Sequence, residues 1–463
     1  MKSVFVVGAG PAGMFAARQV ALAGYDVFIF NRDIKPGGLA EYGIYPTKDK
    51  MKFGLRKQFG QVLALGNVHY FGNVQVGTEY DISIEELQAM RPAAIVFACG
   101  AQGAGRLGLP GENAKGVYAA KDFVYHYNQL PPYASQDFST GRRIGIIGMG
   151  NVAIDIARWL LEDDPRHVTE EVVIIARRGP LEIKFDEKEI GYIERHISKE
   201  ELIGELERVK ERCMRAGQDV SPESVFASHF RHLKEPGFTS TPPRLKFRFL
   251  SSPTAVLADA DGRIAKIEVA ENELVLKPSG DTSAKSTNQK VELELDTLIF
   301  AIGDRHDPNI GLPMGPEGYA TRPDPEHPQA PQFAVWDPGA GQLIAGTYVV
   351  GWARRASTGL VGIARHDGEL GAAEAIAYLK DVPETDTLKE SEILERLREK
   401  KLRPVTKNDL GLLATVEQRI AQERGLTSFK FSDNASMFRA IREEKERIVV
   451  PSNESVGAIS GEK

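Results

Sequence analysis

The hydrophobic residues of this chain form short uninterrupted runs that end at or near glycine. Residues 4–7 read Val-Phe-Val-Val and residues 27–30 read Val-Phe-Ile-Phe, and such runs are typical of strands buried on both faces of a parallel sheet. Residues 14–23 lie between them, carry the pattern of a helix and stop at Gly24. The pattern therefore predicts a complete strand–helix–strand unit near the N-terminus.

A second unit of the same kind follows in the middle of the chain. Residues 144–147 predict a strand, residues 154–161 a helix and residues 172–176 the next strand. Two further apolar runs, 94–99 and 297–302, each end in glycine and predict the strand that closes each half. We therefore expect an α/β fold with two Rossmann-like dinucleotide-binding domains, of which the first is discontinuous.

The rest of the chain is more polar. Residues 271–294 contain a polar stretch that predicts an exposed hairpin tip. Residues 303–341 are rich in proline and glycine and predict a connector that crosses between domains. Beyond Pro383 the pattern becomes helical and charged, as in residues 390–401.

Both predicted first turns carry the glycine pattern of a dinucleotide site. Residues 8–13 read Gly-Ala-Gly-Pro-Ala-Gly and residues 148–153 read Gly-Met-Gly-Asn-Val-Ala. The first glycine allows a tight turn, the second lets the backbone approach a pyrophosphate, and a small third residue permits close packing of helix on strand. The following helix N-terminus offers N–H groups to the phosphates. The alternative is a glycine-rich turn in a Rossmann-like domain that binds no nucleotide.

The residues after each second strand distinguish between nucleotides. An acid at this point suits the ribose 2′-hydroxyl of NAD, whereas arginine suits the 2′-phosphate of NADP. Arg177 and Arg178 follow the second strand of the second unit, and adjacent guanidinium groups can clamp a phosphate. This predicts NADP(H), with a solvated loop pair as the alternative. Asn31 stands at the same point of the first unit and can bond a ribose hydroxyl.

Composition and charge narrow the function classes. Hydrophobic residues make up 42% and charged residues 26% of the 463 residues, which is typical of a globular protein of two or three domains. The 58 Lys and Arg against 64 Asp and Glu give a net charge of −6, without the basic footprint of a nucleic-acid-binding protein. No run approaches the roughly 20 apolar residues of a membrane span, and the N-terminal run is too short for a secretory signal. We expect a cytoplasmic protein without nucleic-acid partner or membrane span.

The cysteine pattern limits the redox chemistry. The chain has two cysteines, Cys99 and Cys213, which lie far apart, and it has no CxxC. This excludes a dithiol redox pair and a four-cysteine zinc or iron–sulfur site within the chain, and we expect no metal. Cys99 lies in a predicted strand, where a buried and unreactive thiol is expected.

With these features, the whole chain resembles the adrenodoxin-reductase-like ferredoxin–NADP reductases and, more weakly, the small subunit of glutamate synthase. The motifs that carry the resemblance are Gly8-Ala-Gly-Pro-Ala-Gly13, Glu41-Tyr-Gly-Ile44, Leu109-Pro-Gly-Glu112, Gly148-Met-Gly-Asn-Val-Ala-Ile-Asp155, Ala176-Arg-Arg-Gly-Pro180, Lys188-Glu189, Gly351-Trp352, Ser357-Thr-Gly-Leu-Val-Gly362 and the segment 416–441. The resemblance implies a discontinuous FAD-binding domain of residues 1–107 and 330–383, and an NADP-binding domain of residues 108–329. Residues 384–463 are expected to form a helical and loop extension that packs on the FAD domain.

The resemblance also assigns site residues. The residues implied for FAD are Gly8, Gly10, Pro11, Ala12, Gly13, Asn31, Gly38, Leu39, Val76, Gly100, Trp352, Gly359, Leu360 and Val361. Among them Asn31 is expected at the adenosine ribose, Val76 near the adenine, and residues 351–352 and 359–361 beside the isoalloxazine, towards which the helix near Gly359 would direct its positive end. Trp352 as a core residue is the alternative. The residues implied for NADP(H) are Gly148, Gly150, Asn151, Val152, Arg177, Arg178 and Glu189, with Glu189 at a ribose.

One departure from the family pattern concerns the proton-handling residues. The family typically has Ala-Pro-Asp-His where this chain has Tyr-Pro-Thr-Lys at residues 45–48. The family histidine is linked through water to the aspartate that Asp155 matches, and Lys48 could pair with Asp155 instead. Asp155, Lys48 and Trp352 are therefore the candidate catalytic residues. The basic run Lys48, Lys50, Lys52, Arg56 and Lys57 is either a docking patch for an acidic carrier protein or a solvated helix face.

These observations favour an FAD-dependent NADPH oxidoreductase that passes electrons from NADPH through the flavin to a one-electron protein acceptor such as ferredoxin. The lack of CxxC removes the disulfide-reductase route within this chain. The alternatives are a glutamate-synthase-like electron-input subunit of a larger complex and a regulatory protein that binds FAD and NADP without turnover.

Overall fold

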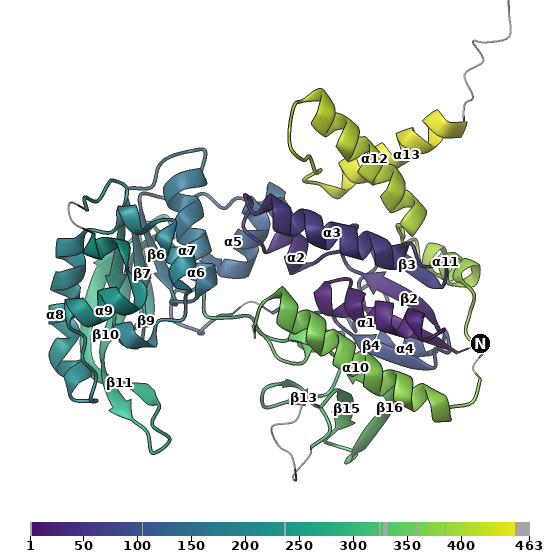
Figure 1. The fold of residues 1–463 in the computed structure, drawn as a ribbon, viewed down its shortest axis with the longest axis horizontal. Helices are drawn as coiled ribbons and strands as arrows, with labels where there is room; N and C mark the ends of the chain where they lie inside the picture. Colours follow the sequence, from purple (N-terminus) through teal and green to yellow (C-terminus); the bar gives the residue numbers. More distant parts are fainter. Residues whose placement is uncertain are drawn as a thin grey trace, which may run out of the picture. The chain divides into compact units, whose positions relative to one another are not determined.

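The computed structural model describes residues 2–103, 105–235, 238–323, 326, 332–357, 359–384 and 386–449 (Figure 1). It divides into two compact units. The first comprises the described parts of residues 1–103, 125–135 and 304–463, and the second those of residues 104–124 and 136–303. Each unit is built around its own parallel sheet, as the sequence pattern predicts.

The first unit contains a six-stranded sheet. Its strand order is β15-β16-β4-β1-β2-β3, and all neighbours are parallel except β15 and β16. The strands are β1 (Ser3–Val7), β2 (Asp26–Asn31), β3 (Val68–Gly72), β4 (Ala94–Phe97), β15 (Ala334–Asp337) and β16 (Gln342–Val349). The predicted strands at residues 4–7 and 27–30 are thereby confirmed, and the strand predicted at residues 94–99 is confirmed as far as Phe97.

Alternate side chains of β1 enter two different cores. Val4 and Val6 pack with α1 (Pro11–Leu22) and α10 (Val361–Asp381), which lie side by side in Figure 1. Phe5 and Val7 point to the other face and pack with aromatic residues of β2 and β3 in what we call the second core of the first unit. Both faces are therefore buried, which explains why the strand sequences are apolar throughout.

The remaining helices of the first unit lie around this sheet. They are α2 (Leu39–Tyr42), α3 (Asp49–Leu63), α4 (Ile84–Gln88), α11 (Glu390–Glu399), α12 (Lys407–Glu423) and α13 (Asn434–Val449). Ile393 and Leu397 of α11 are buried in the second core. Helices α12 and α13 pack on each other around a small core that also contains Ile34 and Val405.

The first unit resumes earlier than the boundary predicted at residue 330. Gly103 and Arg305 exchange two backbone hydrogen bonds, with N–O distances of 2.8 and 2.9 Å. Ile310, Leu312 and Tyr319 are buried in the second core of the first unit. Burial of these apolar side chains places residues 304–323 in the first unit. The sequence pattern predicted a connector that crosses between domains, and the family resemblance implied that these residues belong to the NADP-binding domain. Residues 324, 325 and 327–331 of that connector lie outside the described residues.

The second unit contains a five-stranded parallel sheet and a three-stranded antiparallel sheet. The parallel sheet has the order β5-β12-β6-β7-β8, and the antiparallel sheet the order β11-β10-β9. Buried apolar residues of both sheets, including Ile147, Ile267 and Leu298, form one core. The strands are β5 (Val117–Ala119), β6 (Arg143–Ile147), β7 (Glu171–Ile175), β8 (Arg244–Arg248), β9 (Ser251–Ala258), β10 (Ile264–Leu276), β11 (Thr282–Glu294) and β12 (Thr297–Phe300).

The helices of the second unit follow the predicted pattern with shifted ends. Helix α6 (Asn151–Arg158) begins directly after Gly150, earlier than the predicted start at residue 154, and continues as a π-helix over Trp159–Asp163. The other helices are α7 (Glu187–Gly191), α8 (Lys199–Met214) and α9 (Pro222–His229), while α5 (Ala120–Tyr127) begins in this unit. Strands β10 and β11 form the predicted hairpin, and residues 277–281 at its tip are exposed.

Two expectations about chemistry can be compared with the described residues. Burial raises the pKa of Cys99 and of Cys213 to about 12, so both thiols stay protonated at neutral pH, as expected for unreactive thiols. Among the helices that the structure describes, none combines the length and the apolar character needed to cross a membrane.

Candidate functional site

The first glycine turn lies between β1 and α1. Gly8 has a φ of 105°, and a Cβ placed on it would lie 2.5 Å from the carbonyl oxygen of Ala98. Its N–H donates to the carbonyl of Phe30 at 2.7 Å, so the turn is fixed between two strands. A Cβ on Gly13 would lie 2.0 Å from the carbonyl oxygen of Gly8. Side chains are therefore excluded at the two positions where the turn, the helix and the sheet meet.

Gly10, by contrast, faces open space. No heavy atom lies within 4 Å of a Cβ placed on it. Gly10 is the N-cap of α1, no side chain caps this helix end, and Pro11 and Ala12 form its first turn. An uncapped helix N-terminus below an open glycine suits a pyrophosphate. The residues present therefore fit the phosphates of a dinucleotide.

The second glycine turn repeats this geometry between β6 and α6. Gly148 has a φ of 121°, a Cβ on it would lie 2.2 Å from the carbonyl oxygen of Ala301, and its N–H donates to Ile175 at 3.0 Å. Gly150 again faces open space and is the N-cap of a helix without a side-chain cap. Ala153 replaces the third glycine and is fully buried. Two turns thus fit a dinucleotide, one in each unit.

Asn31, at the end of β2, has a side chain that is committed to the protein. Its Oδ1 accepts from the N–H of Ala9 at 3.0 Å. Its Nδ2 donates to the carbonyl oxygens of Asp33 and Lys35 and to the hydroxyl of Tyr70, at 2.8 to 3.1 Å. Asn31 therefore ties the loop after β2 to the glycine turn, and its expected contact with a ribose stays a prediction.

The other FAD candidates of the N-terminal segment surround the turn or the adjoining core. Gly38, the N-cap of α2, approaches the turn, since a Cβ on it would lie 3.3 Å from Cα of Gly10, and Leu39 is the first residue of that helix. Gly100 follows β4, the strand whose end contacts Gly8. Val76 is buried in the second core.

The segment predicted to border the isoalloxazine also reaches the glycine turn. A Cβ on Gly351 would lie 2.5 Å from Cβ of Ala12. Trp352, next in the sequence, is half-buried, and its expected place beside the isoalloxazine stays a prediction. Leu360 is the N-cap of α10 and is 70% exposed, while Val361 packs on the core. Gly359 is exposed beside it.

Asp367 is a buried residue of this site that sequence reasoning missed. Its Oδ2 accepts from the N–H of Gly351 at 2.5 Å, and its carboxylate pairs with Arg354. The carboxylate fixes the backbone just before Trp352. The neighbouring residues Arg365, His366 and Glu369 are also charged or polar, so the sequence held no clear signal that Asp367 is buried.

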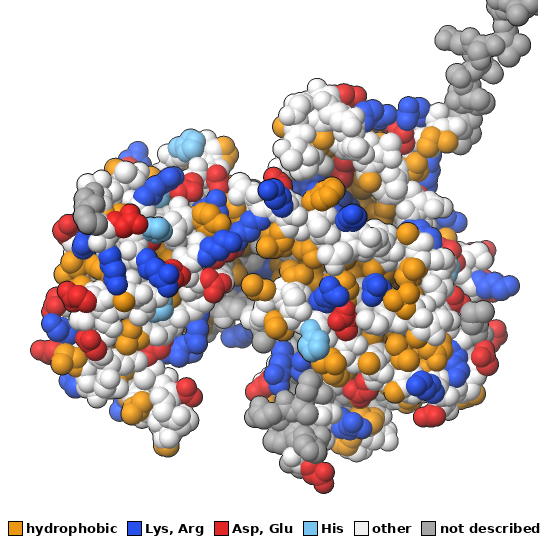
Figure 2. Space-filling view, viewed as in Figure 1, with side chains coloured by type: hydrophobic (Ala, Val, Ile, Leu, Met, Phe, Trp, Pro, Cys, Tyr) orange, Lys and Arg blue, Asp and Glu red, His pale blue; other side chains and the backbone are white. Residues whose placement is uncertain are grey.

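Exposed hydrophobic side chains accompany these residues. Phe53 is 68% exposed and Ile363 is 57% exposed, and both belong to helices of the first unit. Figure 2 shows hydrophobic side chains gathered over the region where Figure 1 places α1 and α3. Large exposed apolar areas usually mark a binding surface.

A charged cluster beside the turn joins distant parts of the chain. Glu41 is 4% exposed, accepts from Arg56 at 2.6 and 2.7 Å, and lies 3.4 Å from Nζ of Lys430. Burial alone would raise the pKa of Glu41, but the hydrogen bonds from Arg56 and the charge of Lys430 outweigh it and lower the pKa to about 2. Lys35 and Glu417 form a further pair at 2.6 Å. The motif containing Glu41 was identified from the sequence, but its partners were not.

Only part of the basic run at the start of α3 is exposed to solvent. Lys52 is 4% exposed, and its Nζ donates to Oδ1 of Asn128 at 2.8 Å. Burial lowers the pKa of Lys52 to about 8. The prediction of an exposed lysine is therefore wrong for Lys52, and Arg56 pairs with Glu41. The spacing of Lys52 to the buried Phe59 and Val62 was the signal that places it on the inner face of the helix.

Arg177 and Arg178 lie at the end of β7 with free guanidinium groups. Neither side chain has a hydrogen-bond or ion-pair partner within the described parts of the chain. Their backbone is held, because the carbonyl of Arg177 accepts from Nδ2 of Asn272 at 2.8 Å and that of Arg178 accepts from the N–H of Leu250 at 3.1 Å. A fixed backbone with two unpaired cationic side chains suits an anion.

The remaining NADP candidates lie at the start of α6 and α7. Asn151 exchanges two hydrogen bonds of 2.7 Å with Asp186, whose carbonyl accepts from the N–H of Glu189 at 2.9 Å. The turn and Glu189 are thereby brought together. Val152 is 45% exposed in the first turn of α6.

Two candidate catalytic residues lie in different units. Lys48 is the N-cap residue of α3 in the first unit, and Asp155 is a half-buried residue of α6 in the second. Their pairing stays a prediction.

The chain is similar in sequence and in structure to known oxidoreductases. Residues 2–216 match the family described as "Pyridine nucleotide-disulphide oxidoreductase". The NADPH-ferredoxin reductase FprA of Mycobacterium leprae is 29% identical over 94% of this chain and 97% of its own length. The mitochondrial NADPH:adrenodoxin oxidoreductase of Salvelinus fontinalis is 30% identical over 95% of this chain and 91% of its own length. The solved structure of Mycobacterium tuberculosis FprA in complex with NADPH has a TM-score of 0.76 at 27% identity and covers 95% of this chain and 99% of its own.

Proposed function

Because the chain belongs to the NADPH:adrenodoxin oxidoreductase family, we propose that it passes electrons from NADPH through FAD to a one-electron carrier protein of the ferredoxin class. The enzyme is a flavoprotein oxidoreductase that uses FAD and NADP(H). The family resemblance drawn from the sequence motifs is thereby confirmed. FAD, when bound, accepts a hydride from NADPH and can release its electrons one at a time.

One observation carries the assignment of the two nucleotides. Both glycine turns fit a pyrophosphate, but only the second is followed by unpaired arginines, Arg177 and Arg178. In the first unit the corresponding residue, Asn31, is engaged by the protein. This difference supports NADP(H) at the second turn, where a 2′-phosphate needs cationic partners, and FAD at the first.

The residues that would hold FAD belong to the first unit. Residues 8–13 would bind the pyrophosphate, and Asn31 and Val76 would lie at the adenosine half. Trp352 and residues 359–361 would border the flavin ring. The uncapped N-terminus of α10 supports this role, because its positive end stabilises negative charge.

The residues that would hold NADP(H) belong to the second unit. Residues 148–152 would bind the pyrophosphate, Arg177 and Arg178 the 2′-phosphate, and Glu189 a ribose. We propose that Asp155, Lys48 and Trp352 act at the reacting rings, with Lys48 in place of the histidine that the family pattern has.

The acceptor and the location follow from chemistry. A carrier that takes single electrons suits a chain without CxxC, since a dithiol relay cannot form within it. The names of the relatives, which include NADPH-ferredoxin reductase and NADPH:adrenodoxin oxidoreductase, support such a carrier. We also propose the cytoplasm as the location, since Cys99 and Cys213 are both free thiols, as in a reducing compartment.

Spectroscopy of the purified protein tests this proposal. We expect a yellow protein whose flavin absorbance is bleached by NADPH faster than by NADH in stopped-flow mixing. A panel of ferredoxin, flavodoxin, quinone and oxygen then identifies the acceptor, and ferredoxin should be reduced fastest. A colourless protein contradicts the FAD assignment, and equal rates with the two nucleotides contradict the NADP assignment. Preference for quinone or oxygen contradicts the carrier assignment.

A further inference from the structure

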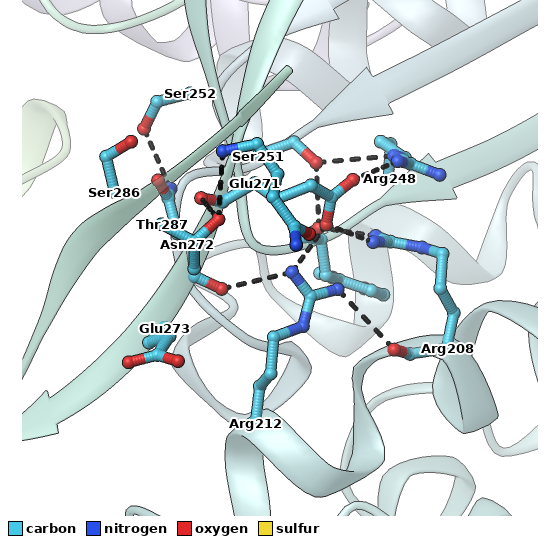
Figure 3. A network of polar contacts seen from close by, with 12 residues as sticks. Arg208, Arg212, Arg248, Ser251, Ser252, Glu271, Asn272, Glu273, Ser286 and Thr287 are labelled. Carbon is cyan, nitrogen blue, oxygen red and sulfur yellow. Dashed lines mark hydrogen bonds and ion pairs between the residues drawn. The ribbon is translucent and has the colours of Figure 1, made fainter. Parts of the chain in front are cut away.

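The turn that carries Arg177 and Arg178 accepts a hydrogen bond from Asn272. Asn272 belongs to a buried polar cluster of the second unit, which Figure 3 shows. At its centre lies Glu271, which accepts from Arg208 at 2.7 Å and also pairs with Arg212 and Arg248. Burial alone would raise the pKa of Glu271, but the hydrogen bond from Arg212 and the charges of Arg208 and Arg248 lower it. The carboxylate is therefore ionised at neutral pH, and the cluster is a fixed set of charges.

Asn272 follows Glu271 at an irregularity of β10. The register of β10 against β11 shifts between Ala270 and Asn272, and pairing with β9 ends at Glu271. Such a bulge re-aims the side chains next to it. Asn272 is 1% exposed, and its backbone N–H donates to the carbonyl of Leu250 at 2.8 Å while its carbonyl accepts from Arg212 at 3.1 Å. Its backbone is thus fixed on both sides.

The side-chain amide of Asn272 connects this cluster to the arginine turn. Nδ2 donates to the carbonyl of Arg177 and to Oγ of Ser252, both at 2.8 Å. Of the two ends of the side-chain amide, only the NH2 can donate to a carbonyl, so the orientation of the amide is determined by its partner. The contact ties the carbonyl oxygen of Arg177 to a buried side chain.

The other contacts of the turn are backbone hydrogen bonds. Ala176 donates to the carbonyl of Arg248 at 2.9 Å, and its own carbonyl accepts from Ser251 at 2.9 Å. The carbonyl of Arg178 accepts from Leu250 at 3.1 Å. Within residues 176–178, the carbonyl of Arg177 is thus the group whose recorded partner is a side chain, and that side chain can be replaced without altering the backbone ladder.

We propose that Asn272 is a positioning residue that holds the Arg177–Arg178 turn in the conformation that grips the 2′-phosphate, and so sets the preference for NADPH over NADH. The inference rests on the proposed NADP site. A turn that is ordered before the ligand arrives loses less conformational entropy on binding. Asn272 touches no nucleotide atom in this role and acts only through the turn.

The Asn272→Leu variant of the full-length protein tests the proposal. It keeps the size of the side chain but removes the donor. Calorimetric binding of adenosine 2′,5′-bisphosphate should weaken about tenfold, as for loss of one buried hydrogen bond, while adenosine 5′-monophosphate should bind within about twofold of wild type. KM for NADPH should rise with kcat at saturation unchanged.

A matched control and a double variant separate positioning from general damage. Thr287→Val removes a hydrogen bond of 2.9 Å to the carbonyl of Glu271 in the same cluster and should leave the preference between the two probes unchanged. In a background that carries both Arg177→Ala and Arg178→Ala, Asn272→Leu should have no further effect on the preference. An additive effect in that background would overturn the proposal.

The remaining outcomes distinguish failure of the proposed NADP site from failure of the proposed role of Asn272. A wild-type protein that binds the two probes equally contradicts the NADP site itself. A wild type that prefers the bisphosphate together with an Asn272→Leu variant that keeps this preference, or that loses both probes equally, overturns the role of Asn272 alone. If Asn272→Leu does not fold, Asn272→Asp serves instead. It can accept from Ser252 but places an oxygen against the carbonyl of Arg177, and should lower the preference further.

Discussion

The two glycine turns of this protein share one backbone design and differ in what surrounds it. Gly8 and Gly148 both have positive φ, and a Cβ on either would strike the carbonyl of an alanine at the end of the neighbouring strand. The residues after the next strand differ. The side-chain amide of Asn31 is hydrogen-bonded to other residues of the protein, whereas the guanidinium groups of Arg177 and Arg178 have no partner among the described residues. We therefore propose that the shared turn binds the phosphates in both units and that the side chains after the next strand select the nucleotide.

The largest effect is expected from alanine at the first glycine of each turn. Gly8→Ala should cost about 3 kcal/mol or more, because strain at positive φ adds to a clash with backbone, and should yield a colourless protein. Gly148→Ala should stay yellow and lose bleaching by NADPH. The flavin spectrum and stopped-flow reduction of each variant measure these effects.

Gly54→Ala on α3 is the control for these glycine variants. A Cβ there meets nothing within 4 Å, so this variant should keep both colour and reduction. If Gly8→Ala retained full flavin content, the comparison of the two turns would fail.

The next largest effect is expected from replacing Arg177 and Arg178. The Arg177→Ala, Arg178→Ala double variant should raise KM for NADPH about 100-fold, since two charge-assisted contacts are lost, and change KM for NADH by about twofold at most. Steady-state kinetics with both nucleotides measure this. Arg215→Ala, at an exposed arginine that pairs with Glu273, is the control and should change neither. An unaltered nucleotide preference in the double variant would refute the role of the pair.

The next effect is on the stability of the fold and is expected at the buried carboxylate beside the first turn. The folded-state pKa of Glu41, about 2, lies below its ordinary value of 4.5. Its ionised form therefore stabilises the fold above pH 4.5, by roughly 3 kcal/mol, and this contribution disappears as the pH falls towards 2. Glu41→Gln should lower the free energy of unfolding at pH 7 by about 3 kcal/mol, with a gap that narrows below pH 4.5.

Urea unfolding at several pH values measures the effect of Glu41. Glu86→Gln is the control, because Glu86 forms an exposed pair with Lys400 and should cost at most about 0.5 kcal/mol. A gap between Glu41→Gln and wild type that stayed constant down to pH 3 would show that charge is not the cause.

The smallest effect is expected at Lys52. Its charged form lowers the stability of the fold, whereas the charged form of Glu41 raises it. The folded-state pKa of Lys52, about 8, lies below the ordinary 10.5, so the folded protein binds fewer protons than the unfolded chain between these values. Stability from this group therefore rises as the pH increases from about 8 to 10. Lys52→Met removes the titrating group and should abolish this rise, which is on the order of 2 kcal/mol between pH 7 and 10, as measured by urea unfolding at pH 7, 8.5 and 10. Lys50→Met, at an exposed neighbour, should leave the rise unchanged.

The sequence allowed the parallel strands and both glycine turns to be predicted because their signals are local. Residues 4–7 and 148–153 carry the apolar run and the glycine spacing within a few positions. The partners of Glu41 could not be predicted, because Lys430 lies 389 residues away and only the folded chain brings them together. Lys52 was misjudged as exposed because its charge was weighed above its helical spacing. Residues 304–323 were misassigned because scattered apolar residues, such as Ile310 and Tyr319, carry no periodic signal.

Because the first unit is built from separate segments of the chain, its parts are synthesised before and after the second unit. The second unit is complete once residue 303 has emerged, while the first sheet still waits for β16 and the α10 helix. Glu41 stays without one of its cationic partners until Lys430 has been translated. The unit that contains the first glycine turn is therefore completed after the second unit, and the segment with Lys430 completes the surroundings of a turn synthesised much earlier.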